Sequence, residues 1–164
     1  MRIGVIADTH IPDRAAKIPD DILNAFIGVD IIIHVGDLTV LSVLEELKKI
    51  CSDVRVVSGN MDCIQVCNKF PEKELIKVGE VKIGVMHGAG PPDGLVGILS
   101  EAFKKDKPDL IIFGHSHAAF NEKKGNIIFF NPGSPTDKVF SSYNSYGMIE
   151  IKGKNIDAKI IKLN

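Results

Sequence analysis

Tryptophan is absent from this chain, and only two of its 164 residues are tyrosine, so there is little aromatic surface on which unpaired bases could stack. An excess of positive charge is missing as well, because the formal net charge is −1. The sequence therefore creates no overall field that would attract nucleic acid or an anionic membrane. We expect no stable nucleic-acid complex, which argues against a nuclease of the DNA-repair type.

Long hydrophobic runs and paired cysteines are also missing. The first apolar run, Ile3–Ala7, is ended by Asp8, so it is too short for a signal-peptide core or a membrane span. The cysteines, Cys51, Cys63 and Cys67, are odd in number and form no Cys-x-x-Cys pair, which fits a reducing compartment better than a disulfide framework. We predict a cytoplasmic protein with no part in a membrane.

The composition is that of an ordinary globular protein, with 45% hydrophobic and 25% charged residues. A chain of 164 residues can bury a sizeable core, and no linker, repeat or low-complexity tract divides it. We predict a single domain over residues 1–164.

Short apolar runs alternate with amphipathic segments over the first two-thirds of the chain. Runs rich in valine and isoleucine have the length of buried strands. They are Ile3–Ala7, Val29–Val35, Val54–Val57, Val81–Met86 and Leu110–Phe113. Helical spacing of apolar residues predicts a helix that starts near Pro19, a second that Thr39 would cap, and a third over Asp93–Lys105.

The last third of the chain has the pattern of two β-hairpins. Turn signals at Lys124-Gly125 and Gly153-Lys154 each separate two strand candidates. The candidates are Ala118–Lys123 and Asn126–Phe130, then Tyr146–Lys152 and Asn155–Ile161. Alternating strands and helices followed by hairpins predict two sheets packed face to face. We therefore expect an α/β fold, a four-layer α/β/β/α sandwich of two mixed sheets with helices outside.

Polar side chains follow all five early strands at the point where each strand ends. They are Asp8, His10, Asp37, Asn60, His87, His115 and His117. In sheets of this type ligands bind at the carboxyl ends of strands, so these side chains should meet at one rim. Any one of them alone is more often a turn or capping residue, and Gly36-Asp37 and Gly59-Asn60 are ordinary turn dipeptides. Their occurrence in order after successive buried strands favours a shared site.

The mixture of imidazole, carboxylate and amide groups, without cysteine, is typical of a catalytic rather than a structural metal site. Seven side chains are too many for one four-coordinate ion with an open position, and about right for two ions that share a carboxylate. Two ions roughly 3.5–4 Å apart can clamp the attacking and leaving oxygens of a phosphoryl displacement. We predict two divalent ions, and the ligand set accepts Mn²⁺, Ni²⁺, Fe²⁺ or Zn²⁺.

These motifs resemble those of the calcineurin-like metallophosphoesterases. The resemblance rests on Asp8-Thr9-His10, Gly36-Asp37, Gly59-Asn60, His87 and Gly114-His115-Ser116-His117. The segment Asn131-Pro132-Gly133-Ser134 extends it toward the small single-domain phosphodiesterases of the family. It implies a two-sheet sandwich, in agreement with the strand pattern, and hydrolysis of a small phosphodiester, with nucleotide-derived esters as candidates.

The resemblance also implies a role for each ligand. One ion would be bound by Asp8, His10, Asp37 and His117, and the other by Asp37, Asn60, His87 and His115, with Asp37 bridging. A hydroxide between the ions would attack phosphorus. Asn60 and His115 would stabilise charge on the phosphate oxygens, so the predicted catalytic residues are Asp37, Asn60 and His115.

One position departs from the family pattern. Many members have a histidine after the glycine–asparagine pair, whereas this chain has Met61, whose side chain cannot transfer a proton. We expect a preference for substrates with acidic leaving groups, and hypothesise that Asp62 or a metal-bound water replaces the histidine. His34, inside the second strand, is interpreted as a structural residue or as one that orients a ligand.

Two alternatives to a phosphodiesterase stay open. Some relatives of this small fold are protein-interaction scaffolds of membrane coats with vestigial catalysis, but a scaffold could discard ligands and all seven are present here. A protein phosphatase is disfavoured by Met61 and by the lack of insertions. A homodimer is compatible with the sequence, although no pattern marks an interface.

Overall fold

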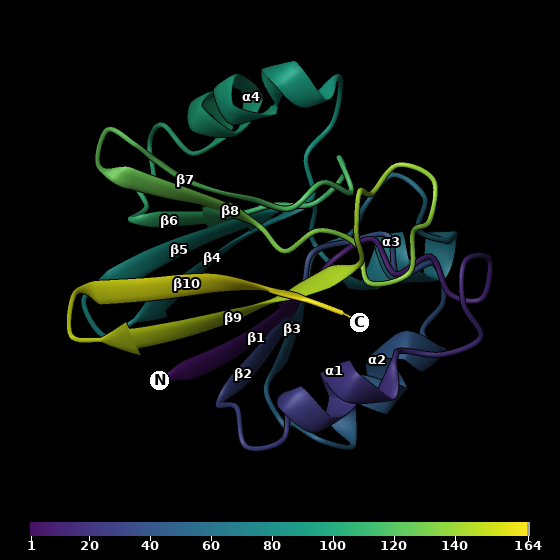
Figure 1. Ribbon diagram of the computed structural model, residues 1–164. Helices are drawn as coiled ribbons and strands as arrows, with labels where there is room; N and C mark the ends of the chain where they lie inside the picture. Colours follow the sequence, from purple (N-terminus) through teal and green to yellow (C-terminus); the bar gives the residue numbers. More distant parts are fainter. Residues whose placement is uncertain (164) are drawn as a thin grey trace.

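The chain folds into two five-stranded sheets that pack face to face (Figure 1). The computed structural model describes residues 1–163. The first sheet has the strand order β10-β9-β1-β2-β3 and the second the order β4-β5-β6-β8-β7. The strands are β1 (Arg2–Ile6), β2 (Ile31–His34), β3 (Val54–Val56), β4 (Lys73–Val78), β5 (Val81–Met86), β6 (Leu110–Ile112), β7 (Phe120–Lys124), β8 (Ile127–Asn131), β9 (Ser145–Lys152) and β10 (Asn155–Lys162).

Both sheets are mixed, as predicted. In the first, β1, β2 and β3 are parallel, while β9 and β10 are antiparallel to their neighbours. In the second, β5, β6 and β8 are parallel, and β4 and β7 are antiparallel at the two edges. Loops after parallel strands of the two sheets meet at one rim, where the backbone N–H of His115 donates to the Asp8 carboxylate.

Helices cover the outer faces of the sheets, which confirms the predicted four-layer sandwich. They are α1 (Asp20–Ala25), α2 (Ser42–Lys48), α3 (Ile64–Lys69) and α4 (Leu95–Ala102), with a 3-10 turn η1 (Pro92–Gly94). Figure 1 shows α1 and α2 outside the first sheet and α4 outside the second. Because each has only six to eight residues, apolar packing against a sheet stabilises these helices more than intrinsic propensity does. None of the helices within residues 1–163 has the length and hydrophobicity needed to cross a bilayer.

The core has one layer between the sheets and one layer under the helices on each side. Alternate residues of a strand face opposite layers, so the central strands contribute to two of them. The buried ring of Phe26 packs on Gly4 of β1, and that of Phe103 packs on Gly84 of β5. An added Cβ at either glycine would lie 2.7 Å from the ring, so both glycines allow an aromatic side chain to sit directly on the sheet.

Four details differ from the sequence prediction, and the first is that the helical spacing misses α3. Thr39 is not a helix cap, because α2 begins at Ser42 and the Thr39 hydroxyl donates to the Ile11 carbonyl oxygen. The strand pattern misses β4, an edge strand in which three of six residues are charged. Helix α4 ends at Ala102, before Lys105, because the chain turns there and the backbone N–H groups of Asp106 and Lys107 both donate to the Phe103 carbonyl oxygen.

Candidate metal centre

The loops after five strands bring the predicted ligands to one rim. Strand β1 is followed by Asp8 and His10, β2 by Asp37, β3 by Asn60, β5 by His87, and β6 by His115 and His117. Asp8, His10 and His117 form one group of candidate metal ligands, and Asp8, Asp37 and His87 form a second. Within each group the ligand atoms lie within 4.8 Å of one another. Five of the seven predicted side chains therefore gather around one buried centre.

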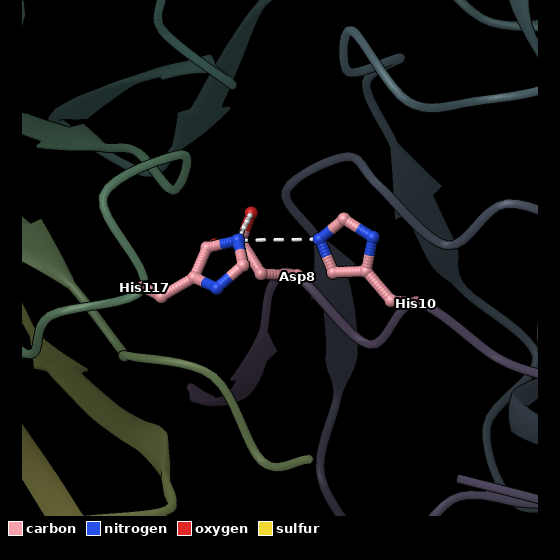
Figure 2. Close-up of side chains that lie close together, drawn as sticks. All are labelled: Asp8, His10 and His117. Atoms are coloured by element: carbon pink, nitrogen blue, oxygen red, sulfur yellow. Dashed lines mark hydrogen bonds and ion pairs between the residues drawn. The ribbon is translucent and has the colours of Figure 1, made fainter. Parts of the chain in front are cut away.

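Each of the two carboxylates in this centre lies between two imidazoles. Asp37 Oδ2 is 3.5 Å from His10 Nε2 and 3.3 Å from His87 Nε2. Asp8 Oδ1 is 3.5 Å from His117 Nε2 and 3.8 Å from His87 Nε2. The rings of His10 and His117 lie beside Asp8 with their Nε2 atoms 3.2 Å apart (Figure 2). These atoms could therefore hold cations between oxygen and nitrogen donors.

Asn60 and His115 lie together at the exposed side of the centre. His115 Nδ1 is 3.0 Å from Asn60 Oδ1, and His115 Nε2 is 3.0 Å from the Gly90 carbonyl oxygen. The His115 ring lies edge-on to His87, with ring centroids 5.4 Å apart. The structure places these two predicted ligands beside the centre, and the His115 side chain is not part of either compact group.

The backbone of the ligand loops has an unusual conformation. Among residues 1–163, seven residues other than glycine have a positive φ, and five of these are predicted ligands. The five are Asp8, His10, Asp37, His115 and His117, with φ between 42° and 67°. Residues with a Cβ adopt such angles at a cost of about 1–3 kcal/mol each, and only where surrounding contacts enforce them. The fold therefore holds these side chains against a local conformational preference.

Glycines beside the ligands let the loops approach one another closely. An added Cβ at Gly36 would lie 2.7 Å from His87 Nδ1, and one at Gly114 would lie 2.9 Å from Asp8 Oδ2. Gly36 also has a φ of 85°, which a residue with a side chain rarely adopts. The glycines of the sequence motifs are thus required by the space around the ligands.

His87 carries the clearest sign that the centre fits a cation. Its Nδ1 lies 2.7 Å from the Val35 carbonyl oxygen, which can only accept, so Nδ1 carries a proton and Nε2 faces Asp8 and Asp37. Nε2 is buried and has no partner with hydrogen-bond geometry among residues 1–163. An imidazole oriented by a backbone carbonyl and aimed at two carboxylates is typical of a metal ligand. The residues present therefore fit a divalent cation.

At neutral pH, one histidine of this centre holds a proton that a cation would have to displace. Burial raises the pKa of Asp8 to about 6. Burial would lower the pKa of His87, but the Asp37 and Asp8 carboxylates outweigh it and raise that pKa to about 9. Burial lowers the pKa of His10, so this ring is neutral at neutral pH. His87 is therefore the side chain whose proton competes with a metal ion.

Metal affinity should rise with pH, because the proton on His87 must leave before its Nε2 can bind a cation. We expect the apparent association constant to increase about tenfold per unit between pH ~7 and ~8.5, and to fall more steeply below pH ~6, where Asp8 also protonates. Calorimetric titration with Mn²⁺ in buffers of different ionisation enthalpy measures the released protons. An affinity that stays constant from pH ~7 to ~8.5 would contradict this expectation.

One buried carboxylate that supports the centre is missing from the prediction. Asp137 Oδ2 lies 2.5 Å from His117 Nδ1, and the carboxylate also accepts the backbone N–H groups of Val139 and Phe140. Burial would raise the pKa of Asp137, but these hydrogen bonds outweigh it and lower that pKa. Asp137 thus holds His117 with Nε2 free to bind a cation. The sequence feature that could have indicated Asp137 is its position three residues after Ser134, the last residue of the Asn131–Ser134 motif.

Loss of the Asp137 charge should weaken metal binding. In Asp137→Asn the amide no longer stabilises the orientation of His117 by charge, and changes to such supporting carboxylates typically cost about 10- to 100-fold in metal affinity. We expect a loss of this size in a Mn²⁺ titration. Asp157→Asn, on the edge strand β10, is the matched control and should bind metal like the parent protein. Equal affinities in the two variants would show that Asp137 does not support the centre.

The segment Asn131-Pro132-Gly133-Ser134 braces the ligand loops. The Asn131 amide donates to the Gly114 carbonyl oxygen at 2.9 Å, and the Ser134 hydroxyl donates to the Asp8 carbonyl oxygen at 2.7 Å. The segment therefore ties the loop after β1 to the loop after β6.

Asp62 joins two of the ligand loops through its carboxylate. Its carboxylate accepts the backbone N–H groups of Asp37, Thr39 and Gly59 at 3.0, 2.7 and 2.7 Å, so both oxygens are occupied. These bonds tie the loop after β2 to the loop after β3. Asp62 thus positions Asp37 through the backbone.

His34 orients the first ligand loop, in agreement with its interpretation. Its Nε2 is 3.1 Å from the hydroxyl of Thr9, which lies between Asp8 and His10 in the chain. Burial lowers the pKa of His34 to about 3, so the ring is neutral. It therefore adds a hydrogen bond to this loop without adding a positive charge beside the centre.

The centre opens into a cleft of about 500 Å³. Around the candidate ligands, its wall includes Asp13, Arg14, Met61, Pro92 and Phe140. A cleft of this size that combines apolar walls with a few converging polar groups suits a small molecule.

The sequence matches the calcineurin-like phosphoesterase superfamily domain over residues 1–154. The chain belongs to this superfamily. Among the relatives of this phosphoesterase, a probable metallophosphoesterase of Methanothermobacter thermautotrophicus is 37% identical over 162 residues, which cover 99% of this chain and 92% of the relative. The vacuolar protein sorting-associated protein 29 (Vps29) of Schizosaccharomyces pombe is 36% identical over 139 residues, 83% of this chain and 73% of the relative.

A solved structure shows the same fold as this calcineurin-like phosphoesterase. The crystal structure of wild-type Vps29 from Entamoeba histolytica, complexed with Zn²⁺, has a TM-score of 0.81 and 28% identity. The two chains cover each other over 100% of their lengths. The family resemblance and the fold predicted from the sequence are therefore both confirmed.

Proposed function

We propose that this protein is a phosphodiesterase that depends on two divalent metal ions. The position of Asp37 carries this proposal, because its Oδ2 lies between His10 and His87 at 3.5 and 3.3 Å. A carboxylate between histidines of two different loops is the group that two neighbouring ions would share. Membership of the calcineurin-like phosphoesterases supports a phosphate ester as the substrate.

The proposed ligands divide into two sets. One ion would be held by Asp8, His10, Asp37 and His117, and the other by Asp37, Asn60, His87 and His115. Asp8 belongs to both compact groups of ligand atoms, so it is a second candidate for the shared carboxylate. Two divalent ions would supply an activated water at neutral pH and neutralise charge on the phosphate. We expect Mn²⁺, with Ni²⁺, Fe²⁺ or Zn²⁺ as alternatives.

The protein's own groups would position the phosphate and leave the departing alcohol unassisted. Asn60 and His115 line the cleft together, and the Asn60 amide nitrogen can donate hydrogen bonds to phosphate oxygens. Met61 offers no proton, and the Asp62 carboxylate is occupied by three backbone N–H groups. Esters whose leaving groups depart without protonation should therefore react fastest.

The test is hydrolysis of bis-p-nitrophenyl phosphate by metal-free protein to which Mn²⁺, Ni²⁺, Fe²⁺ and Zn²⁺ are added back one at a time. The proposal expects turnover that returns with metal and is slower on p-nitrophenyl phosphate, the matching monoester. It also expects slow hydrolysis of dialkyl phosphodiesters. Comparable rates on alkyl and aryl diesters would contradict the proposed lack of a proton donor.

Similarity to Vps29 of S. pombe favours a second candidate, a metal-binding protein-interaction scaffold with vestigial catalysis. The same assay distinguishes the enzyme from the scaffold. Binding of two ions per chain without turnover on any ester would favour the scaffold, whereas metal-restored diesterase activity would favour the enzyme.

A further inference from the structure

Arg14 and Phe140 lie next to each other at the rim of the cleft, and neither is a candidate metal ligand. The Arg14 guanidinium carbon is 5.9 Å from the centroid of the Phe140 ring, and both side chains line the cleft. Phe140 also lies edge-on to His117, with ring centroids 5.9 Å apart. The pair therefore stands directly beside a candidate metal ligand.

Arg14 has donors that its protein contacts leave free. Within residues 1–163 its side chain makes one ion pair, Nη1 to Asp137 Oδ1 at 3.7 Å, and it is 34% exposed. The Arg14 backbone N–H donates to the His10 carbonyl oxygen at 2.8 Å, so the turn after β1 places the residue next to a ligand. A guanidinium has five N–H donors in a planar fork that matches phosphate oxygens. Arg14 thus adds positive charge to a cleft whose wall also includes Asp13 and Asp37.

Phe140 is held out at the mouth of the cleft by a fixed loop. It is 67% exposed, although its backbone N–H is bound to the buried carboxylate of Asp137. Met61, which is 59% exposed, lines the same cleft. Large apolar side chains exposed beside a polar site are typical of a ligand-binding surface. A phosphomonoester has only its leaving group to place against this apolar surface, whereas a diester also has the ester substituent that does not leave.

We propose that Arg14 binds a phosphate oxygen of the substrate and that Phe140 packs on the ester substituent that does not leave. This inference rests on the proposed phosphodiesterase function and names its substrate class, phosphodiesters whose retained substituent is aromatic. Arg14 supplies charge to any phosphate ester, and Phe140 distinguishes among diesters. Substitution of Arg14 and substitution of Phe140 are therefore expected to lower kcat/KM in different patterns across substrates.

Two diesters that share the p-nitrophenyl leaving group test the role of Phe140. Phe140→Ala should lower kcat/KM about tenfold for phenyl p-nitrophenyl phosphate, because an aromatic contact and its buried area are lost. The same variant should leave kcat/KM for methyl p-nitrophenyl phosphate within about twofold. Equal losses on the two esters would overturn the proposed contact.

Arg14→Ala should lower kcat/KM for both esters by about 100-fold, the usual cost of one lost donor to a developing charge. Arg14→Lys should retain part of the activity, because the charge remains and the fork is lost. Arg55→Ala removes an exposed arginine of β3 and is the matched control. An Arg14→Ala variant with the activity of Arg55→Ala would overturn the inference.

Binding measurements separate a substrate contact from support of the ligands through Asp137. The proposal expects Arg14→Ala to bind Mn²⁺ within about twofold of the parent protein. It also expects the metal-loaded variant to bind inorganic phosphate about tenfold more weakly in calorimetry. Weaker Mn²⁺ binding with unchanged phosphate binding would make Arg14 a positioning residue for His117 and overturn the proposal. Because phosphate binding needs no turnover, it tests Arg14 even where hydrolysis, and with it the proposed function, fails.

Discussion

Asp37→Asn is expected to abolish metal-restored hydrolysis of bis-p-nitrophenyl phosphate, with kcat/KM lowered by at least about 10³-fold. Asp37 Oδ2 lies between His10 and His87, and Oδ1 accepts the Met61 backbone N–H at 2.8 Å. The amide keeps the size of the side chain but removes the charge that two cations would share. A bound cation contributes several kcal/mol to phosphoryl transfer, and each ~1.4 kcal/mol is a factor of ten in rate.

The measurement is steady-state kinetics at saturating Mn²⁺, with the number of bound ions determined on the same samples. Asp20→Asn, at the exposed start of α1, is the matched control and should leave both quantities unchanged. We expect Asp37→Asn to bind fewer ions as well as to lose activity. Retention of more than about a tenth of the parent kcat/KM with both ions bound would mean that another carboxylate, such as Asp8, is shared.

A methyl group at position 59 should displace Asp37 and weaken both the fold and the metal centre. An added Cβ at Gly59 would collide with the Asp37 carboxylate and lie 2.6 Å from the Asp37 backbone nitrogen. The loop cannot simply retreat, because the Gly59 N–H donates to Asp62 at 2.7 Å. For Gly59→Ala we expect destabilisation of about 1–3 kcal/mol, the usual cost of overpacking, and a loss of metal affinity of about tenfold or more.

Gly97→Ala offers a matched control within a helix. Gly97 lies in α4, and an added Cβ there meets no atom within 4 Å. This change should leave metal binding as it is and stabilise the protein by up to about 1 kcal/mol, because alanine is the better helix former. Denaturant unfolding and Mn²⁺ titration measure the two effects. Similar results for Gly59→Ala and Gly97→Ala would show that the close approach to Asp37 is not required.

Much of this site could be predicted because strand ends are local features. An apolar run that ends at Asp8 or His87 can be recognised as a strand from its composition. The parallel arrangement of such strands brings their ends to one rim. The same reasoning says less about Asn60 and His115, whose side chains contact each other at the exposed side of the rim. Their rotamers depend on neighbours such as Gly90, which no strand pattern relates to them.

Other features could not be predicted because they depend on which loops meet. Asp62 follows Met61 and is a candidate replacement for the missing histidine by sequence, yet in the structure it accepts backbone N–H groups from the loop after β2. Thr39 has the sequence of a helix cap, yet its hydroxyl donates to Ile11 in the loop after β1. In both cases a contact between loops outweighs the local preference of a short polar side chain.

By itself, the sequence determines the two-sheet sandwich and the set of polar side chains at its rim, since apolar periodicity and strand ends are encoded over a few neighbouring residues. Only the tertiary structure decides that Asp137 holds His117 and that Arg14 and Phe140 share the wall of the cleft. These pairs join loops far apart in the chain. Their contact depends on how the two sheets pack, which no local pattern of residues encodes.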